Sequence, residues 1–238
     1  MSTEYISLRR RENVRPIVLE NRSKYYRDLA NIKQSWSGRL DIWGLGNAFI
    51  MEAVQLLVNA IELFEMGYFD CAYYSLRSAV ETSTTIVYLS DMPDRDARIS
   101  NWKRAGRFPS QSDIVKLLAE RSTSFADMRN KMAAFFRKYR EVDARLNKYV
   151  HKQGLRHFYV SRNHPLSSKS QESFVRSFES YLKACIGIVA VMRLAIDPFP
   201  VLLMDEEILY RCFDSLTEPY SEEFVEEYIG ADTIAAYK

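Results

Sequence analysis

The sequence predicts an all-α protein, an antiparallel helical bundle with helical additions at both ends of the chain. Apolar residues recur every three or four positions over several long stretches, which is the spacing of one face of a helix. The 238 residues include only eight glycines and seven prolines, too few for the many tight turns of an all-β fold. The hydrophobic fraction of 47% is normal for a globular protein and supplies a sizeable core.

Charge is unevenly distributed and suggests three parts. Residues 1–40 carry nine Arg and Lys against four Asp and Glu, a net +5, whereas residues 205–238 carry ten Asp and Glu against two Arg and Lys, a net −8. We therefore expect a basic N-terminal extension over 1–46, a bundle over 47–196 and an acidic C-terminal helical tail over 197–238, packed on the bundle.

The N-terminal extension has two interpretations. Basic residues interleaved with Tyr25, Tyr26 and Trp36 could contact RNA through phosphate pairing and base stacking. The alternative, which the spacing favours, is a helix that packs on the bundle through four apolar side chains. These are Leu19, Tyr26, Leu29 and Ile32.

Two helices joined by a short turn come next. The first is expected from Ala48 to Met66, ended by Gly67, and Asp70 is expected to cap the second. Such a short connection predicts an antiparallel hairpin. The second helix carries a stripe of small residues that would let a neighbouring helix approach closely, namely Ala72, Ser75, Ala79 and Ser83.

The middle of the chain predicts a basic, loop-rich insert over 90–112, a short helix over 112–121 and then a long helix. Ser124 and Asp127 form a capping box that would start the long helix, and Gly154 follows its end. Its apolar positions alternate in steps of four and three, the pattern of a heptad seam that packs along another helix of the same chain or of a partner subunit. They are Met128, Met132, Phe135, Tyr139, Val142, Leu146 and Tyr149.

A last helix is expected from Gln171 to Ile196, and its apolar run is too short to span a bilayer. The three cysteines, Cys71, Cys185 and Cys212, form no C-x-x-C pair and suggest small core residues in a reducing compartment. Together with the lack of an apolar signal region, this predicts a cytoplasmic protein without membrane contact.

The sequence lacks the common motifs that bind metals and cofactors. The chain has no glycine-rich phosphate loop, HExxH or GxSxG. All three histidines, His151, His157 and His164, fall close together, but their spacings of six and seven match no common ligand pattern. We therefore expect neither a metal nor a cofactor.

The end of the long helix carries the residues best suited to chemistry. Arg145 and His151 form an R-x5-H pattern there, after a helical hairpin that carries Arg77-Ser-Ala-Val-Glu81. In these features, residues 47–196 resemble the HEPN superfamily of helical bundles. The resemblance implies a core of four to five helices, usually dimeric, and in many members a metal-independent ribonuclease of toxin–antitoxin, abortive-infection or CRISPR systems.

The resemblance also implies roles for single residues. His151 would be the general base or acid at the ribose 2′-hydroxyl or the leaving oxygen, and Arg145 would hold the scissile phosphate. Asn147, Arg77 and Glu81 would support them. The expected partners are RNA and a second copy of the chain, bound through the heptad seam.

Helix geometry and a simpler interpretation leave alternatives open. Six residues place Arg145 and His151 roughly 120° apart and about 9 Å along a regular helix, so they converge only if the helix unwinds near Tyr149 or two copies meet. Otherwise Arg145 pairs with Glu141, and His151 favours the negative end of the helix. The protein would then be a catalytically silent HEPN-like module that binds a protein partner, or a structural homodimer.

Overall fold

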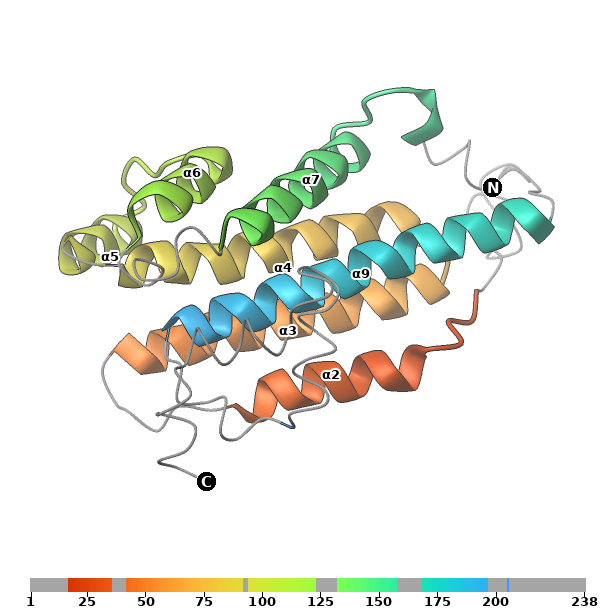
Figure 1. Ribbon diagram of the computed structural model, residues 1–238, viewed down its shortest axis with the longest axis horizontal. Coiled ribbons are helices and arrows are strands. Elements are labelled where there is room, and N and C mark those ends of the chain that lie inside the picture. Colours follow the sequence, from red (N-terminus) through yellow and green to blue (C-terminus); the bar gives the residue numbers. More distant parts are fainter. Residues whose placement is uncertain are drawn as a thin grey trace, which may run out of the picture.

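The described part of the chain is helical throughout its regular structure. The computed structural model describes residues 17–35, 42–91, 94–122, 132–157, 168–196 and 205. Within these ranges it has seven α-helices, one 3-10 turn and no strand, which confirms the all-α prediction. Figure 1 shows the longest helices side by side, with α7 lying across them.

The centre of the bundle is the predicted hairpin of α3 (Ile42–Glu65) and α4 (Phe69–Ser90). Gly67 makes the turn with a φ of 83°, a left-handed conformation that glycine adopts without steric cost. The prediction that Asp70 caps α4 is wrong. Tyr68 precedes the helix, and Asp70 lies inside its first turn, where a negative charge still suits the helix dipole.

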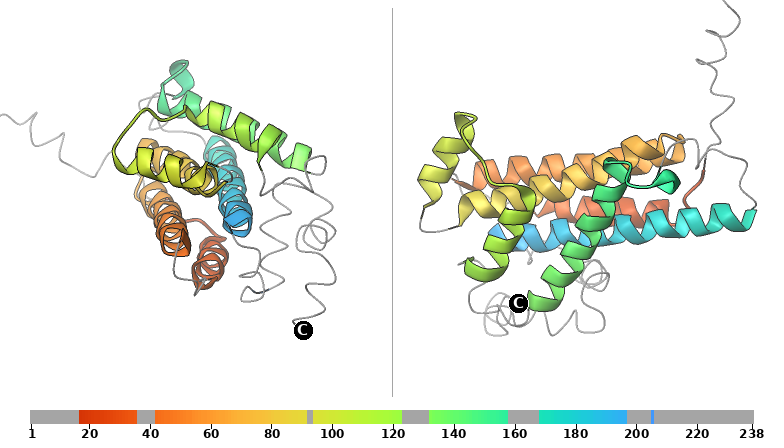
Figure 2. Two further views of the ribbon diagram at one scale, coloured as in Figure 1. Left: turned by 90° about the vertical axis from the view of Figure 1, so that its left-hand side faces the viewer. Right: turned by 90° about the horizontal axis from the view of Figure 1, so that it is seen from above.

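Two further long helices complete the main layer. The last helix, α9 (Ser168–Ile196), packs on α3 and α4, and α2 (Arg22–Gln34) packs on α3 and α9. Figure 2 shows α2 on the side of the bundle opposite to α7. The predicted N-terminal helix therefore exists, with Leu19, Leu29 and Ile32 buried and Tyr26 half-buried.

The division of the chain into three parts stays a prediction. Residue 46 lies within α3, and α2 packs on α3 and α9. Of the acidic tail, the structure describes Asp205, whose backbone N–H donates to Asn31 Oδ1 at 2.7 Å. The remaining tail residues lie outside the described ranges.

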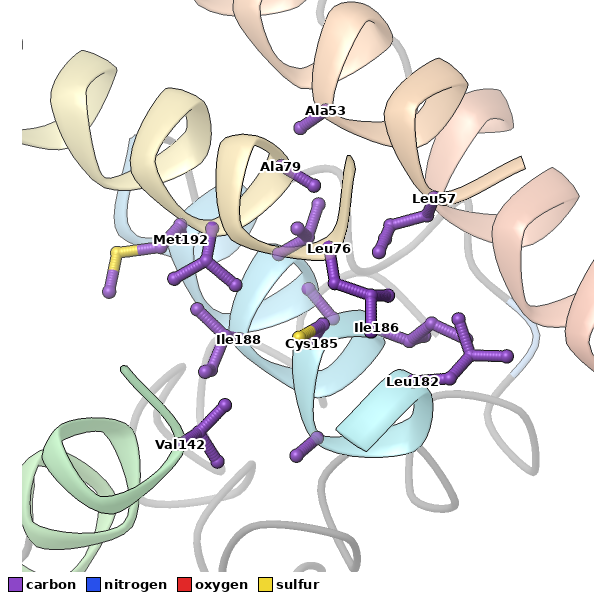
Figure 3. Packing of buried hydrophobic residues seen from close by; sticks show 14 of the residues in the cluster. Ala53, Leu57, Leu76, Ala79, Val142, Leu182, Cys185, Ile186, Ile188 and Met192 are labelled. Atoms are coloured by element: carbon purple, nitrogen blue, oxygen red, sulfur yellow. The ribbon is translucent and has the colours of Figure 1, made fainter. Parts of the chain in front are cut away.

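Small side chains let the central helices pack closely, as predicted for α4. Ala72, Ala79 and Ser83 of α4 are fully buried. Figure 3 shows Ala79 toward Ala53 of α3, with larger residues of α9 filling the space alongside. Since buried methyl and methylene groups are the main source of stability, this three-helix contact fixes the frame on which α7 rests.

Two shorter helices pack against α4. The expected loop over 90–112 is partly wrong because it contains α5 (Arg95–Lys103). This helix buries no residue, so apolar periodicity could not reveal it, but Asp96 in its first turn and Lys103 in its last suit the helix dipole. The next helix, α6 (Gln111–Arg121), begins as predicted to within one residue and is capped by the Ser110 hydroxyl.

The heptad seam lies on α7 (Met132–Val150) and is covered by other helices of the same chain. Phe135, Tyr139, Val142 and Leu146 are 0–4% exposed, Tyr149 is half-buried, and α7 packs on α4, α6 and α9. The predicted capping box at Ser124 and Asp127 lies outside the described residues. Other helices of the same chain cover the seam, so a homodimer would have to form through another surface. The homodimer stays a prediction.

One helix of the described ranges, Gly44–Glu65, is long and apolar enough to cross a membrane by length and composition. It is α3, the helix at the centre of the bundle. Its apolar positions include Leu57, Ile61 and Phe64, which are fully buried against other helices. This packing accounts for its composition, and the expected cytoplasmic location stays a prediction.

Candidate functional site

The C-terminal end of α7 holds His151 in a regular last turn. The His151 N–H donates to the Asn147 carbonyl at 2.8 Å, and that of Gln153 to the Lys148 carbonyl at 3.0 Å. Lys152 then adopts a φ of 52° and Gly154 one of 100°, which ends the helix. The helix does not unwind between Arg145 and His151.

Arg145 and His151 consequently lie on different flanks of α7. Arg145 is exposed and lies beside Tyr181 of α9; burial raises the pKa of the Tyr181 hydroxyl, and the arginine charge lowers it. His151 lies on the flank toward α4. The structure does not bring the two together in one chain, and the ion pairs of the described residues do not include one between Arg145 and Glu141.

Arg77 of α4, expected only as a supporting residue, is the arginine that meets His151. Its Nη1 lies 3.1 Å from His151 Nε2. Its Nε donates to Glu81 Oε1 at 2.7 Å, as the four-residue spacing predicts. Because a guanidinium only donates, His151 Nε2 accepts, and the proton of the neutral imidazole is then on Nδ1.

The direction of the α4 side chains explains this contact. Helix side chains lean toward the N-terminus of their own helix. The two helices run antiparallel, with Thr84 against Tyr139 at one end and Tyr73 against Tyr149 at the other. Arg77 therefore extends toward the C-terminal end of α7 and reaches His151.

A half-buried carboxyl group adjoins the pair. Burial raises the pKa of Asp143, the charge of Arg77 lowers it, and that of Glu81 raises it again. Asn147 Nδ2 donates to Asp143 Oδ2 at 3.3 Å, so the predicted supporting residue Asn147 does face this cluster. Asn147 Oδ1 is buried without a hydrogen-bond partner among the described residues, an unmet acceptor at the centre of the site.

Three contacts that the sequence did not reveal hold the end of α7 on α4. The rings of Tyr73 and Tyr149 stack with centroids 4.0 Å apart. Tyr74 Oη donates to the Val150 carbonyl at 3.0 Å, and Lys152 pairs with Asp70. All three contacts join residues 70–74 of α4 to residues 149–152 at the C-terminal end of α7. The sequence does not show how the two helices align along their length, so it could not predict these pairs.

The other candidate ligands and thiols lie elsewhere. His157 is buried, with Nδ1 2.6 Å from the Gln153 carbonyl and its ring edge-on to Tyr149, so it is a packing residue. His164 lies outside the described residues. Cys185 is buried as predicted, but Cys71 is exposed, so the prediction that every cysteine is a core residue is wrong. No three His, Cys, Asp or Glu of the described ranges gather as a metal would require.

The cluster of Arg77, Glu81, Asp143, Asn147 and His151 thus has a defined chemistry. It combines a permanent cation, an imidazole, which is the side chain most often used as a general acid or base, and two carboxylates. The Arg77 and Glu81 side chains are 22% and 32% exposed and His151 is exposed, so solvent and a large ligand can reach them. Such a set can bind a phosphate and move a proton.

Comparison with known proteins gives no relative: no protein-family model matches the chain, and neither a curated protein nor a solved structure is similar to it. The resemblance to the HEPN superfamily therefore stays a hypothesis that rests on residues 47–196.

Proposed function

We propose that this protein is a HEPN-like, metal-independent endoribonuclease in which His151 transfers protons and Arg77 holds the scissile phosphate. The observation that carries the proposal is the contact of 3.1 Å between Arg77 Nη1 and His151 Nε2 at the solvent-facing end of the α4–α7 junction. In this proposal Arg77 has the phosphate-binding role that the R-x5-H pattern assigned to Arg145.

The chemistry uses only groups of the chain and the RNA. His151 Nε2 takes the proton of a ribose 2′-hydroxyl, the 2′-oxygen bonds to the adjacent phosphorus, and the bond from phosphorus to the 5′-oxygen breaks. A proton returns to that 5′-oxygen, leaving a 2′,3′-cyclic phosphate and a 5′-hydroxyl. Arg77 stabilises the charge that develops on the phosphate oxygens.

Glu81 prepares Arg77 for this role. The hydrogen bond from Arg77 Nε to Glu81 fixes the guanidinium plane, while Nη1 faces His151. A phosphate arriving there replaces the hydrogen bond between Arg77 and His151, which frees Nε2 to accept a proton. Binding of the substrate thereby activates the base.

A second function is favoured by a different aspect of the same cluster. Arg77 pairs with Glu81 and offsets part of the charge of Asp143, so the cluster also stabilises the packing of α7 on α4. In a catalytically silent HEPN-like module or structural homodimer, this would be its whole purpose. Loss of stability on changing Arg77, in a protein whose wild type cleaves no RNA, would identify that case.

The test is incubation of bulk cellular RNA with the purified protein in EDTA, beside His151→Ala. The proposal expects cleavage by the wild type, cyclic phosphate ends on the products, and a rate lower by about 100-fold or more in the variant. Arg27→Ala, an exposed arginine on α2, is the matched control and should cleave normally. Undegraded RNA with the wild-type protein would exclude the nuclease.

A role in a defence or toxin–antitoxin system is part of the same proposal. It expects that inducing the wild-type protein in a bacterium arrests growth, whereas inducing His151→Ala does not. Equal growth of both strains at equal protein levels would exclude the role in defence. The ribonuclease activity is tested separately by the assay with purified RNA.

A further inference from the structure

The outward face of α7 carries a row of cations that ends at His151. Arg137, Arg140, Arg145 and Lys148 are all exposed, and we call them the basic stripe. Arg137, Arg140 and Lys148 lie on one line along the helix, with the uncharged Ala144 between Arg140 and Lys148, and residue 151 continues this line past the helix end at Val150. Arg145 lies next to that line, on the flank toward α9.

Among the described residues, the positive charge of the basic stripe is only partly balanced. Glu141 is the exposed acid among these positions, so four cations and one carboxylate give a net +3. Glu141 is four residues from both Arg137 and Arg145, yet no carboxylate of the described residues forms an ion pair with any stripe cation. By contrast, Arg22 of α2 pairs with both Glu62 and Glu65.

We propose that the basic stripe binds the sugar–phosphate backbone of a single-stranded RNA and leads it to His151 and Arg77. This rests on the proposed function and names its substrate class and binding surface. From residue 137 to residue 151 the line is about 21 Å long, and its three cations, with Arg145 beside them, can each meet a backbone phosphate. Arg145 then binds the backbone of the strand and does not touch the reacting phosphate.

An exposed aromatic ring favours an unpaired strand. The Tyr74 side chain is 45% exposed, and its hydroxyl is fixed on the Val150 carbonyl, directly before His151. It lies one helical turn from Arg77 on α4. Base stacking on an exposed aromatic ring requires a base that is free of its duplex partner, which single strands supply.

The experiment measures binding apart from cleavage by using the His151→Ala protein. A fluorescent single-stranded RNA long enough to span α7 is titrated at several salt concentrations, with and without Arg137→Gln/Arg140→Gln. Each lost phosphate contact reduces the steepness of log K against log salt by about 0.7, so the double variant should have a slope shallower by about 1.4. At about 0.1 M salt its affinity should be lower by roughly tenfold or more.

The matched control is Lys24→Gln/Arg27→Gln, two exposed cations of α2 on the far side of the bundle (Figure 2). It removes the same net charge and should leave the slope and affinity unchanged. Circular dichroism and urea unfolding check that both double variants fold. All four positions are exposed, so we expect changes in unfolding free energy within about 0.5 kcal/mol.

The outcomes separate this inference from the proposed function. Equal effects of the stripe variant and the α2 control, or no effect of either, would overturn the stripe as the binding surface. Tighter binding of an RNA duplex than of the single strand would overturn the substrate class. If the stripe variant loses binding as predicted while the wild type cleaves nothing, the stripe stands and the nuclease proposal fails.

Discussion

Replacing Arg77 by methionine removes the cation shared by three titratable groups while keeping much of the apolar length of the side chain. Glu81 loses its hydrogen bond of 2.7 Å, and the half-buried Asp143 loses the charge that lowers its pKa. Exposed or partly exposed pairs contribute little, so we expect a loss of about 1–2 kcal/mol in unfolding free energy near neutral pH.

The sign of the pH dependence follows from Asp143. Burial raises the pKa of this carboxyl above that of the unfolded chain, about 3.9 for aspartate. A group whose pKa is higher in the folded state stabilises the fold at low pH. This stabilisation is lost as the pH rises from the unfolded pKa through the folded pKa, because the folded protein must release a proton that it holds more tightly than the unfolded chain does. Removing Arg77 raises the folded pKa of Asp143 further, so the destabilisation should be largest at neutral pH and smallest near about pH 4.

Urea unfolding followed by circular dichroism at both pH values provides the assay. Arg77→Met/Asp143→Asn should recover part of the loss at neutral pH, and Arg27→Met should cost nothing. A destabilisation that is independent of pH, or one that Asp143→Asn does not reduce, would refute this electrostatic account.

Two more predictions concern the packing of α7 and the thiols. Leu146 is fully buried in the seam, so Leu146→Ala should lower the free energy of unfolding in urea by about 2–5 kcal/mol. The sedimentation coefficient of the native protein should stay unchanged. A change of oligomeric state would show that the seam joins two copies. In a Cys212→Ser background, Cys71 should react with a thiol reagent in the native protein, whereas Cys185, whose thiol pKa burial raises, should react only after unfolding. Equal rates for the two thiols would contradict the burial assigned to α9.

Apolar periodicity predicted the parts of the fold that bury side chains. The α3–α4 hairpin, the seam of α7 and the long final helix follow directly from residues such as Leu57, Leu76 and Leu146, because burial selects their spacing. The same reasoning missed α5, which buries nothing. It also misjudged Asp70, because the helix begins after Tyr68, whose side chain makes no capping hydrogen bond, so no residue of the usual capping types marks this boundary.

The candidate site was only partly predictable for a related reason. Periodicity indicates which face of a helix is buried but not how two helices align along their length. That alignment decides that Arg77 meets His151, although the two are far apart in sequence. The helical angle between Arg145 and His151, by contrast, follows from sequence spacing alone, and the structure keeps the two residues on separate flanks.

The central claim is that Arg77, and not Arg145, acts with His151 on the phosphate. The most direct measurement is the single-turnover rate of cleavage of a saturating single-stranded RNA in EDTA by Arg77→Met and by Arg145→Gln. Arg77→Met should lower this rate by about 100-fold or more, as loss of a charge-stabilising donor does, while Arg145→Gln should weaken binding and change the saturated rate by less than about threefold. The reverse order, with Arg145→Gln inactive and Arg77→Met active, would contradict the account.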